Sequence, residues 1–281
     1  MITRIPFESL SFLRLITKTS KSQIWLAKLS DDLVIVKEIP LSYLSASPHR
    51  ADHVWQERQV LDLLTEINYP KSPKLIGTSK TKQSLINVME LIFGAPMHLH
   101  MQSITLSCAK YFFSEIINIV QSLHSHRIVH KDIKLSNFIL CENSARQLVI
   151  CDFGLSFILT GSPTNVECSC GTLHSKAPEK IVSFAQDFFS LGIILYELLN
   201  PQFSSHNWTY KFCLESISHI PDATDLVSQL AHPDVSRRLC DFSSIRNHPF
   251  LRDTPMEPPQ IDPSIAYQFI FGRSKNPLDD F

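Results

Sequence analysis

Short apolar runs separated by polar residues follow one another over residues 11–40, a pattern typical of a meander of β-strands. The runs are Phe12–Ile16, Ile24–Leu29 and Leu33–Ile39. Residues 51–64 instead repeat apolar side chains near the helical spacing, and Pro70 and Pro73 follow, so they predict a helix and its end. Two further apolar runs predict that strands return after this helix, at Leu75–Thr78 and Leu85–Ile92.

The periodicity becomes helical beyond Gly94 and Pro96, which interrupt the pattern and mark a candidate hinge. One face of a predicted long helix carries Phe113, Ile116, Ile117, Val120 and Leu123. The segment Asp187–Leu199 is apolar almost all round, as a buried helix is, and shorter helices are predicted at Leu214–Ile217 and Ala223–Leu230. The pattern therefore predicts an α+β chain with a β-rich first third and a helical remainder.

The last residues, 253–281, differ from both parts. They hold five of the seventeen prolines and show little periodicity, so they predict an extended tail that runs over the surface. The chain is thereby divided into a β-rich part over residues 1–91, a helical part over residues 92–252 and this tail.

The composition suits one globular unit or two small lobes that share a cleft, since 44% of the 281 residues are hydrophobic. The 26 Lys and Arg residues balance 27 Asp and Glu, so no charge excess is available for a phosphate backbone and we expect no nucleic-acid partner. The most apolar stretch, Phe188–Leu199, is shorter than the roughly 20 residues of a membrane span. The N-terminus does not resemble a signal peptide, and we expect no membrane partner.

The cysteines and glycines bear on further classes of site. Seven cysteines is an odd number, and five of them lie inside or beside apolar runs, as reduced thiols do, so we expect a cytoplasmic or nuclear protein. Cys168 and Cys170 have no second ligand pair at metal-binding spacing, which favours loop thiols over a zinc site. The seven glycines form no close cluster, which excludes the dinucleotide fingerprint and the Walker A loop.

Three acidic or amide positions around two short predicted strands carry the candidate chemistry. Asn137 lies five residues after Asp132, and the apolar run Val149–Cys151 leads directly into Asp152. Phosphoryl transfer from a nucleotide needs such a set, because the metal takes hard oxygen ligands and the accepting hydroxyl needs a nearby carboxylate.

A lysine and a glutamate upstream extend this set. Lys37 ends the apolar strand Leu33–Val36, and Glu57 lies on the helix that follows. A lysine at a strand end with a carboxylate partner on a helix positions phosphates. Each residue alone is typical of a solvated surface, but their coincidence with the three downstream positions favours a functional site.

Over roughly residues 12–252 the chain resembles the eukaryotic protein kinases. VHKDIKLSN (129–137) resembles the catalytic loop, CDFG (151–154) the metal loop and APE (177–179) the end of the activation segment. Further matches in the family's order are Gly171, Thr172, Asp187, Asp234 and Arg238, the last with Glu179 as its usual partner. The resemblance implies a two-lobed protein kinase fold of the α+β class, with a β-rich N-lobe that has one main helix and a mostly helical C-lobe.

The resemblance also implies ATP and Mg²⁺ as cofactors and a role for each matching residue. Lys37 would hold the α- and β-phosphates and pair with Glu57, Asp132 would accept the substrate hydroxyl's proton, and Lys134 would neutralise the γ-phosphate. Lys134 and Thr172 indicate the serine/threonine type. The magnesium ligands would be Asn137 and Asp152. The other nucleotide contacts would be Ile16, Thr17, Thr19, Ser22, Ile24, Ile35, Met89, Glu90, Ile92 and Ile139.

Three stretches resemble the AGC group, closest to the cyclic-AMP-dependent catalytic subunits. They are NVMELIFGAPM (87–97), INYPKSPKLIG (67–77) and PLDDF (277–281). In that group the tail crosses the cleft, and an acidic-aromatic motif like Asp279-Asp280-Phe281 borders the nucleotide; a plain acidic C-terminus is the alternative. Glu197 would bind arginine in the substrate, but Ser136 and Pro96 replace its usual partners, so we expect at most a weakened arginine preference.

Several positions depart from the family pattern. Thr17, Thr19 and Ser22 replace the three glycines of the phosphate-covering loop, so side chains hold the backbone N–H groups further from phosphate. Ile35 replaces a small alanine over the adenine ring and crowds it. Cys168 stands at the usual activation-loop phosphothreonine, beside a glutamate that offers a fixed negative charge.

The sequence therefore predicts a signalling serine/threonine kinase that transfers the γ-phosphate of ATP to Ser/Thr hydroxyls of protein substrates. Two alternatives stay open. One is a pseudokinase scaffold with weak or no ATP turnover, favoured by the glycine-free loop and Ile35; the other is a divergent non-AGC cell-cycle kinase. The resemblance also allows a regulatory subunit as a partner.

Overall fold

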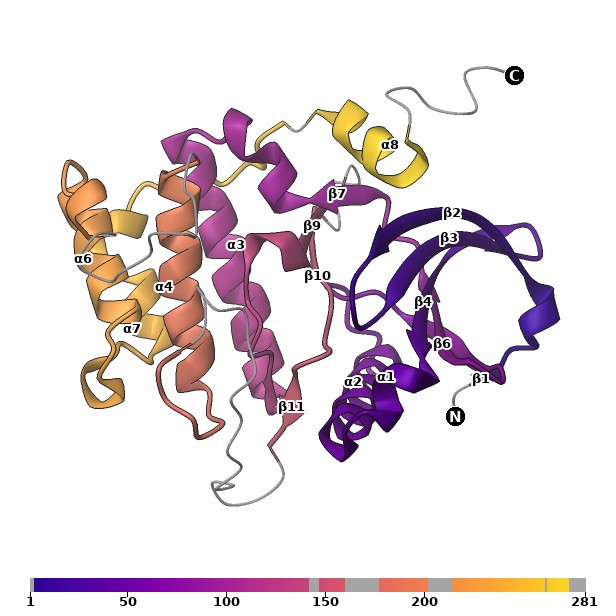
Figure 1. Ribbon diagram of the computed structural model, residues 1–281. Coiled ribbons are helices and arrows are strands. Elements are labelled where there is room, and N and C mark those ends of the chain that lie inside the picture. Colours follow the sequence, from indigo (N-terminus) through magenta and orange to yellow (C-terminus); the bar gives the residue numbers. More distant parts are fainter. Residues whose placement is uncertain (1–2, 142–146, 160–176, 202–213, 261, 273–281) are drawn as a thin grey trace. The chain divides into compact units, whose positions relative to one another are not determined.

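A computed structural model describes the chain as two compact units, each with its own buried core (Figure 1). The described residues are 3–141, 147–159, 177–201, 214–260 and 262–272. The first unit comprises Met1–Ala95, Ile139–Gly154 and Asp262–Phe281, and the second comprises Pro96–Phe138 and Leu155–Ile261. The chain thus leaves the first unit after Ala95 and returns to it twice, whereas the division expected from the sequence is consecutive.

A six-stranded sheet with the order β1-β5-β6-β4-β3-β2 forms the body of the first unit. Its strands are β1 (Thr3–Arg4), β2 (Leu10–Lys18), β3 (Gln23–Leu29), β4 (Asp32–Pro40), β5 (Leu75–Lys80) and β6 (Ser84–Glu90). β1 pairs with β5 in parallel, and the other neighbours are antiparallel. The five strands predicted from apolar runs are confirmed, with ends shifted by at most two residues.

Alternation along the central strands separates a core face from a site face. The core cluster consists of Ile5, Leu10, Ala27, Val34, Val36, Ile86 and Val88. Ile35 and Lys37 alternate with the core positions of β4, and Asn87 and Met89 alternate with those of β6, so these four side chains share the opposite face. In the β4–β6 register, Lys37 stands opposite Asn87 and Ile35 opposite Met89.

Strand β1 adds an edge strand that the apolar pattern does not predict. It is two residues long, and the buried Ile5 that follows donates its N–H to the carbonyl of Thr78 at 2.9 Å. A Cβ on Gly77 would lie 2.5 Å from the Thr3 carbonyl oxygen. Glycine at this position therefore permits the close parallel pairing.

Two helices follow β4 in the first unit. They are α1 (Leu41–Ser45) and α2 (Pro48–Glu66). Helix α2 contains the predicted helix 51–64, and its most buried positions, Glu57, Val60, Leu61 and Leu64, recur at spacings of three and four. Glu57 therefore lies on the buried face of α2 among apolar side chains.

A three-stranded sheet with the order β10-β9-β7 completes the strands of this unit. Its members are β7 (Gly94–Pro96), β9 (Phe138–Cys141) and β10 (Leu148–Ile150). The sequence predicts an interruption at Gly94 and Pro96, whereas these residues form strand β7. A Cβ on Gly94 would overlap the Leu140 carbonyl oxygen, so this glycine serves the close approach of two strands.

Helices form the body of the second unit (Figure 1). They are α3 (Leu106–Ser125), α4 (Ala185–Leu199), α6 (Pro221–Leu230) and α7 (Phe242–Arg246), and residues 214–216 are helical too. Helix α4 packs against α3 and α6, and twelve of its fifteen residues are buried, so the buried helix predicted there is confirmed. A Cβ on Gly192 would lie 2.7 Å from the Ala231 nitrogen, so the contact between α4 and α6 requires glycine.

Shorter elements connect these helices. The strands β8 (Ile128–Val129) and β11 (Phe157–Ile158) pair in antiparallel fashion. Within the described ranges, 3-10 helices span Phe7–Ser9, Met97–Ser103, Leu135–Asn137, Val235–Arg237 and Pro249–Leu251. None of the helices in the described ranges has both the length and the apolar character needed to cross a membrane.

Helix α8 (Pro263–Phe271) lies where the sequence predicts an extended tail, so that prediction is wrong over these residues. Asp262 caps the first turn by accepting the N–H of Ser264 at 2.9 Å. Gly272 ends the helix in the left-handed conformation, at a φ of 71°. The proline count misleads here because Pro263 occupies the first helical turn, where a missing N–H costs nothing.

Candidate active site

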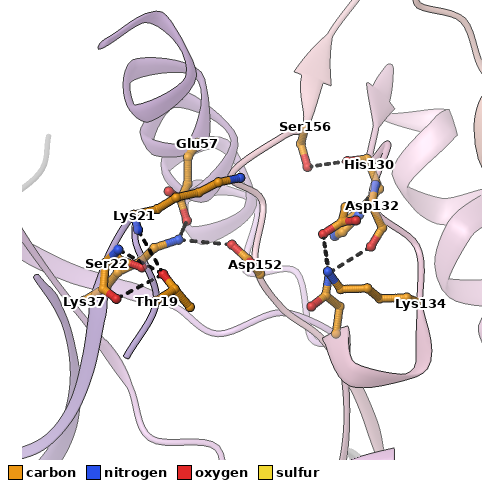
Figure 2. A network of polar contacts seen from close by, with 11 residues as sticks. Thr19, Lys21, Ser22, Lys37, Glu57, His130, Asp132, Lys134, Asp152 and Ser156 are labelled. Atoms are coloured by element: carbon orange, nitrogen blue, oxygen red, sulfur yellow. Dashed lines mark hydrogen bonds and ion pairs between the residues drawn. The ribbon is translucent and has the colours of Figure 1, made fainter. Parts of the chain in front are cut away.

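Three side chains of the first unit form one ion-pair cluster (Figure 2). The Lys37 Nζ donates to Glu57 Oε1 at 2.5 Å and to Asp152 Oδ1 at 3.0 Å. The side chains of Lys37 and Glu57 are 12% and 4% exposed, whereas that of Asp152 is 50% exposed. Lys37 thus joins a buried carboxylate to one that solvent or a ligand reaches.

Local structure brings these residues together from three separate elements. Lys37 lies on the site face of β4, Glu57 lies on the buried face of α2, and Asp152 comes two residues after β10. Asp152 has a φ of 59°, which is uncommon for a residue other than glycine and typical of functional sites. A Cβ on Gly154 would lie 3.2 Å from Asp152 Oδ1 and 3.8 Å from Lys37 Nζ, so the glycine leaves room beside the cluster.

The cluster keeps Lys37 charged. Burial alone would lower the pKa of the Lys37 ammonium, but the carboxylates of Asp152 and Glu57 outweigh burial and raise it. Burial raises the pKa of Glu57, and the Lys37 charge opposes this rise. The site therefore presents a fixed cation whose second carboxylate partner, Asp152, is accessible.

Every predicted nucleotide contact belongs to the first unit. These residues come from four strands of the large sheet, from β9 and from the segment after β6. They are Ile16 and Thr17 on β2, Ile24 on β3, Ile35 on β4, Met89 and Glu90 on β6, Ile139 on β9, Thr19 and Ser22 in the β2–β3 turn, and Ile92 after β6. The register places Ile24 opposite Lys37 on β3 and Ile35 opposite Met89 on β6, so apolar side chains flank the lysine on β3 and along its own strand.

The main-chain N–H of Glu90 already has a hydrogen-bond partner in Lys74, the residue before β5. The Glu90 N–H donates to the Lys74 carbonyl at 2.9 Å, and the Glu90 side chain accepts the Lys74 N–H at 3.1 Å. A backbone contact from Glu90 to a nucleotide base would therefore use its carbonyl oxygen. No such constraint could be seen in the sequence.

The side chain of Thr19 closes the β2–β3 turn (Figure 2). The hydroxyl of Thr19 accepts the N–H groups of Lys21 and Ser22, each at 3.1 Å. The Thr19 N–H donates to the Ser22 carbonyl at 2.9 Å. Where a glycine loop would leave its N–H groups for phosphate, a threonine hydroxyl engages two of them here.

Asn87 is a polar neighbour of this cluster that sequence reasoning missed. Its side chain is 5% exposed, shares the site face with Lys37 and stands directly opposite it in the register. Within the described part of the chain, its Nδ2 is buried and has no hydrogen-bond partner. The place of Asn87 beside the cluster is recognised only from the strand register and from the residues that surround its amide in the structure.

The second unit holds a separate set of predicted residues (Figure 2). The Lys134 Nζ donates to Asp132 Oδ2 at 2.7 Å. The Asn137 Nδ2 donates to the Asp132 carbonyl at 2.8 Å and to Asp132 Oδ2 at 3.2 Å. Asp132 and Asn137 are buried and the Lys134 side chain is 23% exposed, so two donors orient a largely enclosed carboxylate.

A buried carboxylate on α4 holds the loop that carries Asp132. The oxygens of Asp187, which is fully buried, accept the N–H groups of His130 and Lys131 at 2.9 and 2.8 Å. His124 approaches the same carboxylate at 2.9 Å. Lys131 takes a φ of 66°, so Asp187 fixes the main chain at a conformation that L-residues rarely adopt.

Three further residues of the second unit are candidates from the sequence: Arg238, Asp234 and Glu197. Arg238 forms a bidentate pair with Glu179, with distances of 2.6 and 3.0 Å, while Asp234 accepts the Ser236 N–H and caps a 3-10 helix. Glu197 lies on α4, where burial raises its pKa to about 7 and the Lys134 charge opposes this rise. Glu197 therefore titrates near neutral pH.

Some predicted positions lie outside the described residues. They are Thr172, Gly171, Cys168 and its neighbouring glutamate, and the motif at 277–281. Their predicted roles stay predictions.

The donor chemistry fits magnesium bound together with a nucleotide. No group of three or more His, Cys, Asp and Glu side chains that could hold a metal occurs within the described ranges. Mg²⁺ is usually held by one or two carboxylates together with phosphate oxygens and water, not by an all-protein cage. Asp152 supplies an accessible carboxylate in the first unit, and Asn137 supplies an amide oxygen in the second.

A buried lysine–carboxylate cluster in a β-rich unit and an oriented Asp-Lys-Asn loop in a helical unit define the protein kinase class. In agreement, residues 18–251 match the family model described as the protein kinase domain. The chain belongs to the protein kinase family.

Relatives of this chain are named as protein kinase C enzymes or as serine/threonine kinases. The chain is 30% identical over 268 residues to protein kinase C delta type of Mus musculus, and 28% identical over 263 residues to serine/threonine-protein kinase Sgk2 of Homo sapiens. It is 27% identical over 266 residues to serine/threonine-protein kinase YPK1 of Saccharomyces cerevisiae. These alignments cover 89%, 85% and 88% of this chain but 39%, 70% and 38% of the relatives, so the chain spans about two fifths of the mouse and yeast proteins.

Proposed function

We propose that this protein is an ATP- and magnesium-dependent serine/threonine protein kinase that phosphorylates Ser/Thr hydroxyls of protein substrates. The observation that carries the proposal is the Lys37–Glu57–Asp152 cluster, in which a buried cation meets an accessible carboxylate. Positioning and electrostatic stabilisation supply nearly all the catalysis that phosphoryl transfer needs.

Residues of the first unit bind and orient the nucleotide in this proposal. Lys37 holds the α- and β-phosphates, and Glu57 keeps the lysine directed toward them. Asp152 holds Mg²⁺, which supplies neutralisation of phosphate charge when bound. The apolar side chains of Ile16, Ile24, Ile35, Met89 and Ile139 enclose the base.

Residues of the second unit act on the substrate and the transferred group. Asp132 orients the acceptor hydroxyl and takes its proton, and Asn137 fixes Asp132 through its amide while its oxygen serves as the second metal ligand. Lys134, paired with Asp132 at 2.7 Å, moves its charge to the γ-phosphate as the nucleotide binds. Thr172 supports the serine/threonine assignment through its sequence position alone.

The finer assignment is part of the same proposal. Relatives such as protein kinase C delta and Sgk2 support an AGC-type kinase, and a particular similarity to the cyclic-AMP-dependent catalytic subunit rests on the short stretches quoted from the sequence. A regulatory subunit is a proposed partner on that ground. A cytoplasmic or nuclear location is supported by Cys108, Cys141, Cys151 and Cys240, none of which forms a disulfide.

A pseudokinase scaffold is the second candidate, and two observations favour it. Thr19 engages the N–H groups of Lys21 and Ser22, which reduces what the β2–β3 turn offers to phosphate. Ile35 adds side-chain volume opposite Met89, where the base is expected. The two candidates differ in turnover and not in fold.

The test is magnesium-dependent transfer of labelled γ-phosphate from ATP to a degenerate Ser/Thr peptide library. The proposal expects transfer by the wild type, loss of transfer in Asp152→Ala, and wild-type transfer in Asp31→Ala, an exposed carboxylate of the same unit. ATP binding without transfer, measured on the same samples, would favour the scaffold.

A further inference from the structure

A cavity of about 520 Å³ lies within the second unit, lined by the end of α3, the start of α4 and helix α7. Sites for small ligands usually have volumes of about 300–1,000 Å³. Among the described residues that line the cavity, none is assigned above to the nucleotide, the metal or the substrate. The cavity is therefore a feature that the candidate active site does not use.

An aromatic wall (Phe184, Phe188, Phe242 and His124) covers one part of this cavity. The His124 ring centroid lies 4.4 Å from that of Phe184, 5.4 Å from that of Phe242 and 5.6 Å from that of Phe188. The Phe188 and Phe242 rings lie 4.7 Å apart. Aromatic rings at such distances attract further flat apolar groups, so the wall suits the apolar body of a ligand.

Arg246 brings a positive charge to the cavity. Its Nη2 donates to the amide oxygen of Asn118 at 3.0 Å and to the amide oxygen of Gln121. Both acceptors are neutral, and no carboxylate of the described residues forms an ion pair with Arg246. The two amides thus orient the guanidinium, while its charge and its other N–H groups can still bind an anion.

The acidic residue on the described wall of the cavity, Asp241, is engaged by helix α7. Its Oδ2 accepts the N–H of Ser244 at 2.6 Å, and hydrogen bonds from Ser244 lower the pKa of the Asp241 carboxyl. Main-chain N–H groups at the start of the helix thus offset the charge of this carboxylate. Charge complementarity at the cavity therefore favours an anion on Arg246.

His124 connects the cavity to the loop that carries Asp132. Its Nε2 lies 2.9 Å from Asp187 Oδ2. The same carboxylate accepts the N–H groups of His130 and Lys131. A chain of hydrogen bonds therefore runs from the wall of the cavity to the main chain next to Asp132.

We propose that this cavity binds a small amphipathic carboxylate, with its apolar body on the aromatic wall and its carboxylate on Arg246, and that the ligand stabilises the Asp132 loop through His124. A ligand that binds only the arrangement with the wall in place adds its binding free energy to that arrangement. The inference goes beyond the proposed function, because it requires neither a nucleotide nor phosphate transfer.

The experiment titrates the full chain with 2-naphthoate and with 2-naphthamide, a neutral probe of nearly the same shape. Calorimetry is expected to show that the wild type binds the carboxylate about tenfold more tightly than the amide, because a charge-assisted pair forms with Arg246. Arg246→Gln should remove this difference. Arg237→Gln, which changes an exposed arginine of the same unit outside the cavity, should keep it. Equal affinity of the wild type for the two probes overturns the proposal.

Cys240 reports whether the probe occupies this cavity. Its thiol is free and exposed and lines the cavity, whereas Cys108 on α3 does not line it and serves as the reference. Saturating 2-naphthoate should slow modification of Cys240 by N-ethylmaleimide several-fold, leave Cys108 unchanged, and slow amide exchange at residues 130–132 without any nucleotide. Binding that leaves Cys240 labelling unchanged overturns the site, and protection of Cys240 without slower exchange overturns the link to the loop.

Discussion

The two units hold their site residues in different ways. In the first unit, the functional side chains pair with one another, since Lys37 lies between Glu57 and Asp152 and its charge depends on both. In the second unit, the reactive loop is held from outside by Asp187, a buried carboxylate that binds main-chain N–H groups. The side-chain cluster of the first unit sets the charge of Lys37, whereas Asp187 of the second unit fixes the main-chain geometry of the loop.

This difference separates two kinds of failure. Changes in the first unit are expected to alter nucleotide binding, because its ion pairs are the groups that meet phosphate. In the second unit, changes at Asp132 or at Asp187, which holds its loop, are expected to alter transfer or loop stability and to leave the nucleotide affinity intact. Each prediction below tests this separation at one position.

The largest expected effect is at Asp132. Asp132→Asn removes the proton acceptor but keeps the size of the side chain, so transfer should fall by about 10³-fold with an unchanged Kd for Mg·ATP. Lys37→Met should lower transfer and also weaken Mg·ATP binding. Lys28 is an exposed lysine on the neighbouring strand, so Lys28→Met should change neither transfer nor Mg·ATP binding. Steady-state kinetics and nucleotide titration on all three variants measure the split. An equal loss of nucleotide affinity in Asp132→Asn would remove the distinction between the units.

The next effect is on stability. Asp187→Ala leaves the buried N–H groups of His130 and Lys131 without their acceptor, so the free energy of unfolding should fall by about 3 kcal/mol. Exposed Asp222 on α6 supplies the control, since Asp222→Ala should cost less than about 1 kcal/mol. Denaturant unfolding gives both values, and hydrogen exchange at residues 130–132 should quicken in Asp187→Ala alone. Unchanged exchange there would mean that the loop holds its conformation without Asp187.

Much of the candidate site could be predicted because its signals are local. Asp132 and Asn137 lie within one short motif, and Lys37 lies at the end of an apolar run that forms β4. The strand alternation that puts Lys37 on the site face follows directly from the sequence. Predicting these positions required only the short-range sequence pattern and the resemblance to a family.

What could not be predicted depends on distant neighbours. Arg14 on β2 donates to the Phe269 carbonyl of α8 across 255 residues, a contact that leaves no periodic trace in either segment. The amide nitrogen of Asn87 has no hydrogen-bond partner among the described residues, a property that depends on the residues around it. Strand β1 pairs with β5 through two residues only. Helix α8 is a different case, because Asp262 and Gly272 are local capping signals for it. The proline content of the tail nevertheless favoured the prediction of an extended segment.

A smaller, pH-dependent effect is expected at Glu197. Burial raises its pKa to about 7, so the side chain is mostly neutral at pH 6 and mostly a carboxylate at pH 8. A carboxylate attracts arginine, so the ratio of kcat/KM for an arginine-containing peptide to that for its alanine counterpart should rise a few-fold between these pH values. Glu197→Gln should make the ratio independent of pH. A ratio that rises equally in the variant would assign the titration to another group.

The smallest expected effect, at Asn87, tests how closely the first unit depends on its polar set. A buried amide N–H without a partner costs free energy, and leucine is similar in shape, so Asn87→Leu should raise the free energy of unfolding by about 1 kcal/mol. The same change at exposed Asn118, whose amide donates to Glu115, should give no gain. Because Lys37 already has two carboxylate partners, the Kd for Mg·ATP should stay unchanged in Asn87→Leu. A loss of stability or affinity would instead show that the amide contributes to the cluster, and that the first unit needs a neutral donor beside its ion pairs.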